Sequence, residues 1–178
     1  SGELQVWNTD TYQLTQSTQN TNDILYGVSI SPDGQLVAYG GADNTARLLQ
    51  ISNLSEKLKF DNHSNWVLGT VFSVDGTHLV TTGRDRALKL IEVESGSFID
   101  DINASNKGYG EIYSLARHPS KDQILAAGED GIPRLYQIFR TIRRDVGNTD
   151  FNLIRAFDRQ LAAVNVVAFS PNGNRFAT

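Results

Sequence analysis

The feature that most constrains this chain is a series of similar turns along its length. Four segments rich in Pro, Asp, Asn and Gly each follow a short alternating apolar run, and they step by 42, 45 and 52 residues. Pro presets φ for a turn, and Asp-Gly or Asn-Gly tolerates positive φ, so each segment is expected to reverse the chain between two strands. The turns are Ser31-Pro32-Asp33-Gly34, Ser73-Val74-Asp75-Gly76, His118-Pro119-Ser120-Lys121-Asp122 and Ser170-Pro171-Asn172-Gly173.

A second periodic feature follows the first three turns. After another apolar run comes an Asp, and six residues later an apolar or aromatic side chain within a third alternating run. These pairs are Asp43 and Leu49, Asp85 and Ile91, and Asp130 and Tyr136. A unit of about 42 residues with several short strands is typical of a β-propeller blade, and blades stack because one alone cannot bury both faces. The sequence predicts an all-β chain of four-stranded antiparallel blades, a partial ring of about four, without long helices outside residues 139–152.

In this arrangement the chain resembles the WD-repeat family over nearly all of its length. The family's Trp-Asp pair is degenerate here and reads Trp7-Asn8, Leu49-Gln50, Ile91-Glu92 and Tyr136-Gln137. The resemblance implies a single propeller segment, with strands of a preceding blade at 2–14 and the start of a following blade at 163–178. Three whole blades are expected between them, at 24–60, 66–102 and 111–157.

The resemblance also implies a buried polar network. In the family, a His ahead of the first strand, a Ser or Thr on the second strand and the turn Asp are joined by hydrogen bonds. His63, Thr82 and Asp85 match these positions, and Asp43 and Asp130 match the turn Asp of the neighbouring blades. A His beside a carboxylate also suits acid–base chemistry. The structural role is the stronger interpretation, because catalytic residues usually occur once and this Asp recurs in every blade.

Several residues fall near the rim where WD-repeat proteins usually bind partners. Trp66 stands where a first strand enters its blade, and it is expected either to be an exposed anchor or to pack between blades. Arg84 and Arg86 flank the turn Asp of the same blade, and Tyr109 and Glu111 precede the first strand of the next. The alternative for these charges is a solvated surface.

The 52-residue step contains an insertion at 139–152 with three positive charges, Arg140, Arg143 and Arg144. Such a loop is either a docking element for an acidic or phosphate-bearing partner or an ordinary connection between two strands.

Composition argues against other classes of function. The chain has 16 Lys and Arg against 20 Asp and Glu, so it lacks the basic excess of nucleic-acid-binding surfaces. It has no Cys, which excludes disulfides, thiolate zinc sites and cysteine nucleophiles. The three His, His63, His78 and His118, share no ligand spacing, and no phosphate loop or nucleophile elbow is present. No catalytic, cofactor or metal site is therefore predicted, and no apolar run approaches the roughly 20 residues that span a bilayer.

The predicted function is a non-catalytic scaffold that binds other proteins through its rim loops. A second predicted partner is the rest of the propeller, because the chain resembles a piece of a longer protein. The alternative is an accessory propeller of a larger bacterial enzyme or of a cytochrome-fused protein. Residues 154–157, leading into 164–171, resemble propellers of such proteins. We also expect the isolated chain to associate through the apolar faces of its end blades.

Overall fold

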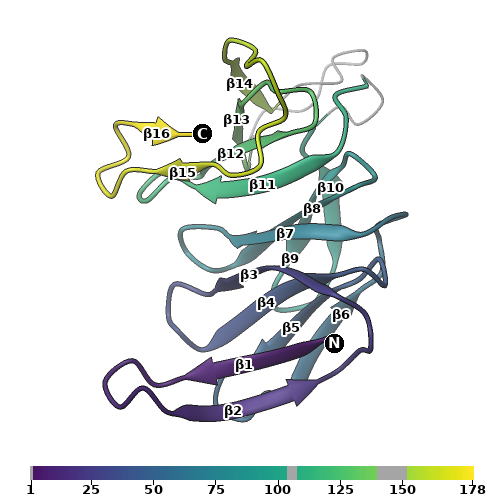
Figure 1. Ribbon diagram of the computed structural model, residues 1–178, viewed down its shortest axis with the longest axis vertical. Helices are drawn as coiled ribbons and strands as arrows, with labels where there is room; N and C mark the ends of the chain where they lie inside the picture. The colour runs from purple at the N-terminus through teal and green to yellow at the C-terminus, as the bar shows by residue number, and fades with distance from the viewer. Residues whose placement is uncertain (1, 104–107, 140–151) are drawn as a thin grey trace.

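The computed structural model describes residues 2–103, 108–139 and 152–178, and within these ranges every regular element is a strand. The strands form five antiparallel sheets (Figure 1). The N-terminal half-blade contains β1 (Glu3–Trp7) and β2 (Leu14–Gln19). Blade 1 contains β3 (Leu25–Ile30), β4 (Leu36–Gly41), β5 (Ala46–Gln50) and β6 (Glu56–Phe60). Blade 2 contains β7 (Val67–Phe72), β8 (His78–Gly83), β9 (Leu88–Glu92) and β10 (Phe98–Asp101). Blade 3 contains β11 (Ile112–Arg117), β12 (Gln123–Gly128), β13 (Arg134–Gln137) and β14 (Leu153–Ala156). The C-terminal half-blade contains β15 (Ala168–Phe169) and β16 (Phe176–Ala177).

The predicted fold class is confirmed. Each complete sheet is a meander whose strands pair in chain order, and the sheets follow one another from the N-terminal half-blade at the bottom of Figure 1 to the C-terminal half-blade near its top. The two half-blades are separate sheets, so the ring is partial. No helix in the described ranges is long and apolar enough to cross a membrane.

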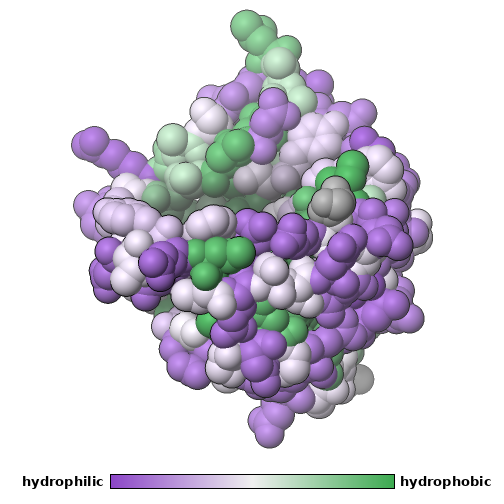
Figure 2. Space-filling model, turned by 60° about the horizontal axis from the view of Figure 1, so that its bottom comes forward, coloured by the Kyte–Doolittle hydropathy of each residue, from purple (hydrophilic) through white to green (hydrophobic). Residues whose placement is uncertain are grey.

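Apolar side chains on both faces of the complete blades pack against the neighbouring sheets and form the cores between them. Leu48 and Leu49 are neighbours on β5 and point to opposite faces, as strand geometry requires, yet both are fully buried. Leu48 belongs to a core shared with blade 2, and Leu49 to a core shared with the N-terminal half-blade. On the face shown in Figure 2 the surface is largely hydrophilic, and hydrophobic residues gather in separate areas.

The turns between the first and second strands form through a recurring hydrogen bond. In blade 2, Ser73 Oγ donates to Asp75 at 2.6 Å and accepts from the backbone N–H of His78 at 3.0 Å. The bond from Ser73 is the main reason that the pKa of Asp75 is lowered to about 2. In blade 3, His118 replaces the serine, and its Nδ1 accepts from the N–H groups of Ser120 and Lys121. His118 therefore caps a turn.

A glycine contact sets the spacing of blades 1 and 2 along their first strands, β3 and β7. A Cβ added to Gly27 would lie 2.6 Å from the carbonyl oxygen of Leu68 and 2.7 Å from the Cα of Gly69. Nearby, the hydroxyls of Ser29 and Thr70 are hydrogen-bonded across the two blades at 2.9 Å. The two backbones thus approach as closely as glycine allows.

We expect Gly27→Ala to destabilise the chain by about 1–3 kcal/mol, the usual cost of overpacking, because both obstructing atoms belong to the backbone. Urea unfolding followed by circular dichroism measures this effect. Ser17→Ala, on the exposed face of β2, is the control and should change the free energy of unfolding by less than about 0.5 kcal/mol. Equal midpoints for Gly27→Ala and the unmodified chain would contradict the role of this contact.

Candidate functional site

A buried polar network ties two loops of blade 2 together. His63 Nδ1 lies 2.8 Å from Asp85 Oδ2 and 3.0 Å from Asp85 Oδ1, and His63 Nε2 lies 2.7 Å from the hydroxyl oxygen of Thr81. The backbone N–H of Ser64 also donates to Asp85, at 3.1 Å. The side chains of His63 and Asp85 are only 1% and 7% exposed. The network holds the loop before β7 against the turn between β8 and β9.

The prediction that Thr82 is the hydroxyl member was wrong by one residue. Successive residues of a strand point to opposite faces, and Thr81 is on the face that meets His63. The Thr82 hydroxyl instead donates to the carbonyl of Ala87 within the same turn. Both threonines are fully buried, so burial alone does not separate them.

Blades 1 and 3 neutralise the turn Asp in a different way. Arg47 lies 2.6 Å from Asp43, and Arg134 lies 2.6 Å from Asp130, each Arg four residues after its Asp. The Arg side chains are 6% and 10% exposed. At the corresponding position in blade 2, Lys89 pairs with Asp101 instead, because His63 already satisfies the turn Asp. A signal for these ion pairs is present in the sequence as Asp-x-x-x-Arg in two of three units, but the spacing of the repeats does not by itself reveal it.

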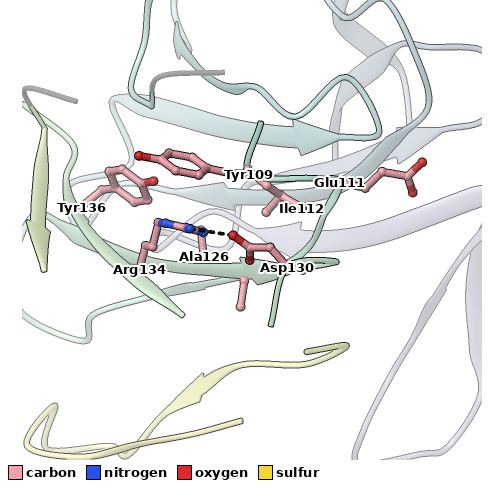
Figure 3. Close-up of a pocket in the computed structure, with 9 residues that line it drawn as sticks. Tyr109, Glu111, Ile112, Ala126, Asp130, Arg134 and Tyr136 are labelled. Atoms are coloured by element: carbon pink, nitrogen blue, oxygen red, sulfur yellow. Dashed lines mark hydrogen bonds and ion pairs between the residues drawn. The ribbon is translucent and has the colours of Figure 1, made fainter. Parts of the chain in front are cut away.

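The position of Thr81 is also filled differently in blade 3, where Ala126 leaves a small pocket (Figure 3). Tyr109 covers Arg134 with its ring centroid 3.9 Å from the guanidinium carbon. The pocket volume is about 10 Å³, enough for a single water molecule. A pocket of this volume is too small to bind a substrate. The pairing of Asp130 with Arg134 also leaves no net charge from these two residues in the pocket.

In blade 1 the corresponding residue is Tyr39, which is 1% exposed. Its hydroxyl has no hydrogen-bond partner among the described residues. Burial raises the pKa of the Tyr39 phenol to about 12, although the nearby Arg47 opposes this shift. The same position therefore holds the hydrogen-bonded hydroxyl of Thr81 in blade 2, the methyl group of Ala126 in blade 3 and the phenol of Tyr39, without a hydrogen bond, in blade 1.

We expect Asp85→Ala to destabilise the chain by about 1–3 kcal/mol, because it leaves the buried His63 imidazole and the backbone N–H of Ser64 without their acceptor. His63→Ala should have a similar effect, and the double variant should cost less than the sum of the two. Thermal melts measure all three. Melting midpoints unchanged in both single variants would show that the network contributes nothing to stability.

The same network predicts a dependence on pH. Burial alone would raise the pKa of Asp85, but hydrogen bonds from His63 and backbone N–H groups outweigh it and hold the pKa below the ordinary 3.8. A depressed carboxyl pKa contributes stability above pH 3.8 that is lost as the pH falls through the folded-state value. The difference in unfolding free energy between the unmodified chain and Asp85→Asn should therefore shrink in acid. A constant difference from pH 6 to pH 2.5 would contradict this.

Tyr39→Phe should leave stability unchanged or raise it by up to about 1 kcal/mol, because it removes a buried hydroxyl that makes no hydrogen bond. Tyr136→Phe is the matched control, since Tyr136 is equally buried and is not without a partner. The control should not gain stability. Denaturant melts of both variants make the comparison, and a clear loss in Tyr39→Phe alone would show that the phenol has an unseen partner.

On the rim formed by the ends of β7 and β8, four side chains from three blades are in contact. The Trp66 ring stacks on Tyr26 of blade 1, with centroids 5.8 Å apart and planes inclined by 23°. The guanidinium of Arg84 lies 4.1 Å from the indole centroid, and Arg84 Nε lies 3.2 Å from a carboxylate oxygen of Glu111 in blade 3. We call these four residues the Trp66 patch. Trp66 is half-buried, so it both packs between blades and remains partly accessible.

The other residues expected at this rim are distributed differently. Arg86 is exposed and adopts a positive φ of 68° in the turn after Asp85. Tyr109 lies on Arg134 in blade 3 and is not part of the Trp66 patch. Arg140, Arg143 and Arg144 lie outside the described residues.

The sequence alone did not point to two tyrosines, one within the Trp66 patch and one beside Glu111. Tyr26 and Tyr113 occupy the second position of β3 and β11, one blade before and one blade after Trp66. Burial, and then the carboxylates of Glu111 and Glu129, raise the pKa of Tyr113. Their shared strand position was visible in the repeat, but they read there as ordinary strand residues.

Comparison with known proteins agrees with this architecture. The family model described as "WD domain, G-beta repeat" matches residues 12–49 and 54–92. Two WD repeats are thus detected in the first half of the chain. Its relatives include guanine nucleotide-binding protein subunit beta from Solanum tuberosum, 26% identical over 99% of this chain and 48% of the relative. Subunit beta-2 from Nicotiana tabacum is 25% identical over the same shares, and Protein HIR1 from Yarrowia lipolytica is 26% identical over 86% of this chain and 17% of its own length. The chain spans about half the length of the beta subunits that it matches.

In the part of the chain that the structure describes, no three His, Asp or Glu side chains gather as metal ligands. The polar networks are nearly buried and tie loops to strands, whereas the four residues of the Trp66 patch are partly accessible to solvent. The patch is therefore the candidate functional site.

Proposed function

We propose that the chain is a non-catalytic scaffold that binds another protein through the Trp66 patch. The observation that carries this proposal is the continuous contact of Tyr26, Trp66, Arg84 and Glu111 across three blades. Trp, Tyr and Arg are the residues in which interface binding energy is most often concentrated. Here they are held by rigid sheets, so little conformational entropy is lost when a partner binds.

The ion pair favours binding by orienting Arg84. The side chains of Arg84 and Glu111 are 39% and 28% exposed, so the pair is accessible and contributes little to stability by itself. Its effect is to hold the guanidinium over the indole, from where its N–H groups can donate to an acceptor on a partner.

The relatives support a role in an assembly. Several are named as subunits of a guanine nucleotide-binding protein, and a subunit works together with other chains. Because this chain spans about half of their length, we propose that residues 1–178 form one propeller segment and that further blades are among its partners. No observation favours an accessory domain of a bacterial enzyme or of a cytochrome-fused protein.

Trp66→Ala should weaken binding to a partner by at least 30-fold, which corresponds to the roughly 2 kcal/mol of a hot-spot residue. Tyr12→Ala is the matched control, because Tyr12 is 84% exposed in the turn between β1 and β2, away from the Trp66 patch. Partners captured on the immobilised chain are purified and their Kd is measured by calorimetry for each variant. Arg84→Ala, which leaves the Trp66 ring in place, should give a smaller loss.

Circular dichroism separates loss of binding from loss of folding in these variants. A partner that binds the folded Trp66→Ala chain as tightly as the unmodified one would overturn the proposal that this patch is the binding site.

A further inference from the structure

A groove lies between blades 1 and 2 on the rim opposite the Trp66 patch. It is lined by residues from the turns that follow β3, β7 and β9 and from the beginnings of β4 and β6, and all of these elements belong to complete blades. Its volume is about 390 Å³, within the range of roughly 300–1,000 Å³ that is usual for ligand sites. Trp66 precedes β7 and the groove follows it, so the two surfaces lie at opposite ends of the same strand.

The most deeply buried residues of this groove are apolar. Leu36 and Val93 line it, are 8% and 6% exposed, and belong to the core between blades 1 and 2. The turns of the two blades also lie close together, because a Cβ added to Gly76 would be 3.2 Å from Cδ of Pro32. The base of the groove is therefore built from packed core residues, and its shape does not depend on a partner.

The exposed residues of the groove are mostly acidic. Asp33, Asp75, Glu92 and Glu94 carry four negative charges, and Lys57 carries the single positive charge among the lining residues. Four negative charges less one positive charge leave a net charge of −3. The whole chain has a formal net charge of −4, so this small area is far more acidic than the rest of the molecule.

Two of these carboxylates are fixed in position by their turns. Asp33 Oδ1 accepts hydrogen bonds from the Ser31 hydroxyl and the N–H of Gln35, and Asp75 Oδ1 accepts from Ser73 and Thr77. The serine bonds are the main cause that lowers the pKa of both Asp residues, that of Asp75 to about 2. The other oxygen, Oδ2, makes no hydrogen bond with the described residues in either Asp. Both residues are therefore ionised at neutral pH and have an oxygen left to accept a bond from a ligand.

An apolar base with acidic walls matches the shape of a long basic side chain. Lys and Arg have an apolar stem, which would contact Leu36 and Val93, and a charged head, which would meet the carboxylates above them. An apolar ligand would desolvate the carboxylates without pairing them, and an acidic ligand or a nucleic acid would be repelled. Within the described residues no three acidic or His side chains gather as ligands, so a bound metal ion does not account for these charges.

We infer that this groove binds a segment of a protein partner that is rich in Arg or Lys. Charge complementarity selects the partner, and the apolar base supplies contact with the stems of its side chains. The binding weakens as salt is added, because the carboxylates are exposed and their field is screened. The site is separate from the Trp66 patch, so the chain would hold one partner on each rim and bring the two together.

A fluorescein-labelled hexa-arginine peptide is the probe, and fluorescence anisotropy at low ionic strength measures its Kd for the 178-residue chain. Glu92→Gln combined with Glu94→Gln should weaken binding about tenfold, because two exposed charges are removed from the groove. Asp23→Asn combined with Asp61→Asn is the matched control. It removes the same charge from exposed loops on the Trp66 rim and should change the Kd less than about twofold. Circular dichroism confirms that each variant is folded.

Other results would overturn the inference. Absence of binding, or equal weakening in the two double variants, means that the peptide does not recognise this groove. Tighter binding when Arg140, Arg143 and Arg144 are all replaced by Gln means that arginines of the chain itself compete for the groove in place of a partner. Trp66→Ala should leave the Kd of the peptide unchanged, so this test and that of the Trp66 patch can fail independently.

Discussion

Every blade of this molecule has two apolar faces, and each face needs a neighbouring blade to cover it. The neighbours Leu48 and Leu49 on β5 are both fully buried because one faces blade 2 and the other faces the N-terminal half-blade. Where a neighbour is lacking, as beside Val28 and Ile30 on β3, apolar side chains remain exposed. The stability of each blade thus depends on contacts with the next, as in other stacked-repeat architectures.

The recurring Asp has one shared contact and several variable ones. In each blade its Oδ1 accepts the backbone N–H two residues later, from Thr45, Ala87 and Ile132. This local bond fixes the turn and explains why Asp recurs at the same phase. The second partner comes from elsewhere and differs, since His63 serves blade 2 while Arg47 and Arg134 serve the other two. A near-buried carboxylate requires some partner, and either a His or an Arg meets that requirement.

These two kinds of contact explain how much could be predicted from sequence. Local turn chemistry and strand alternation repeat with the blade, so the blades, their order and the turn Asp residues followed from the spacing of residues such as Asp43 and Asp85. Contacts between strands depend on which face of the sheet a side chain occupies. The spacing of the repeat does not show whether Thr81 or Thr82 is on the face that meets His63. The stack of Tyr26 on Trp66 joins residues 40 positions apart in different blades, and no local pattern reports it.

The candidate binding surface is a property of the stack and belongs to no single blade. Tyr26 directly precedes Gly27, whose close approach to Gly69 brings β3 against β7, so the glycine contact and the stack on Trp66 depend on the same spacing of blades 1 and 2. Arg84 then links Trp66 to Glu111 of blade 3. Separation of any two of these blades would divide the patch while leaving each sheet intact. Burial of apolar faces, which drives the stacking, is therefore also what assembles the surface that we propose for a partner.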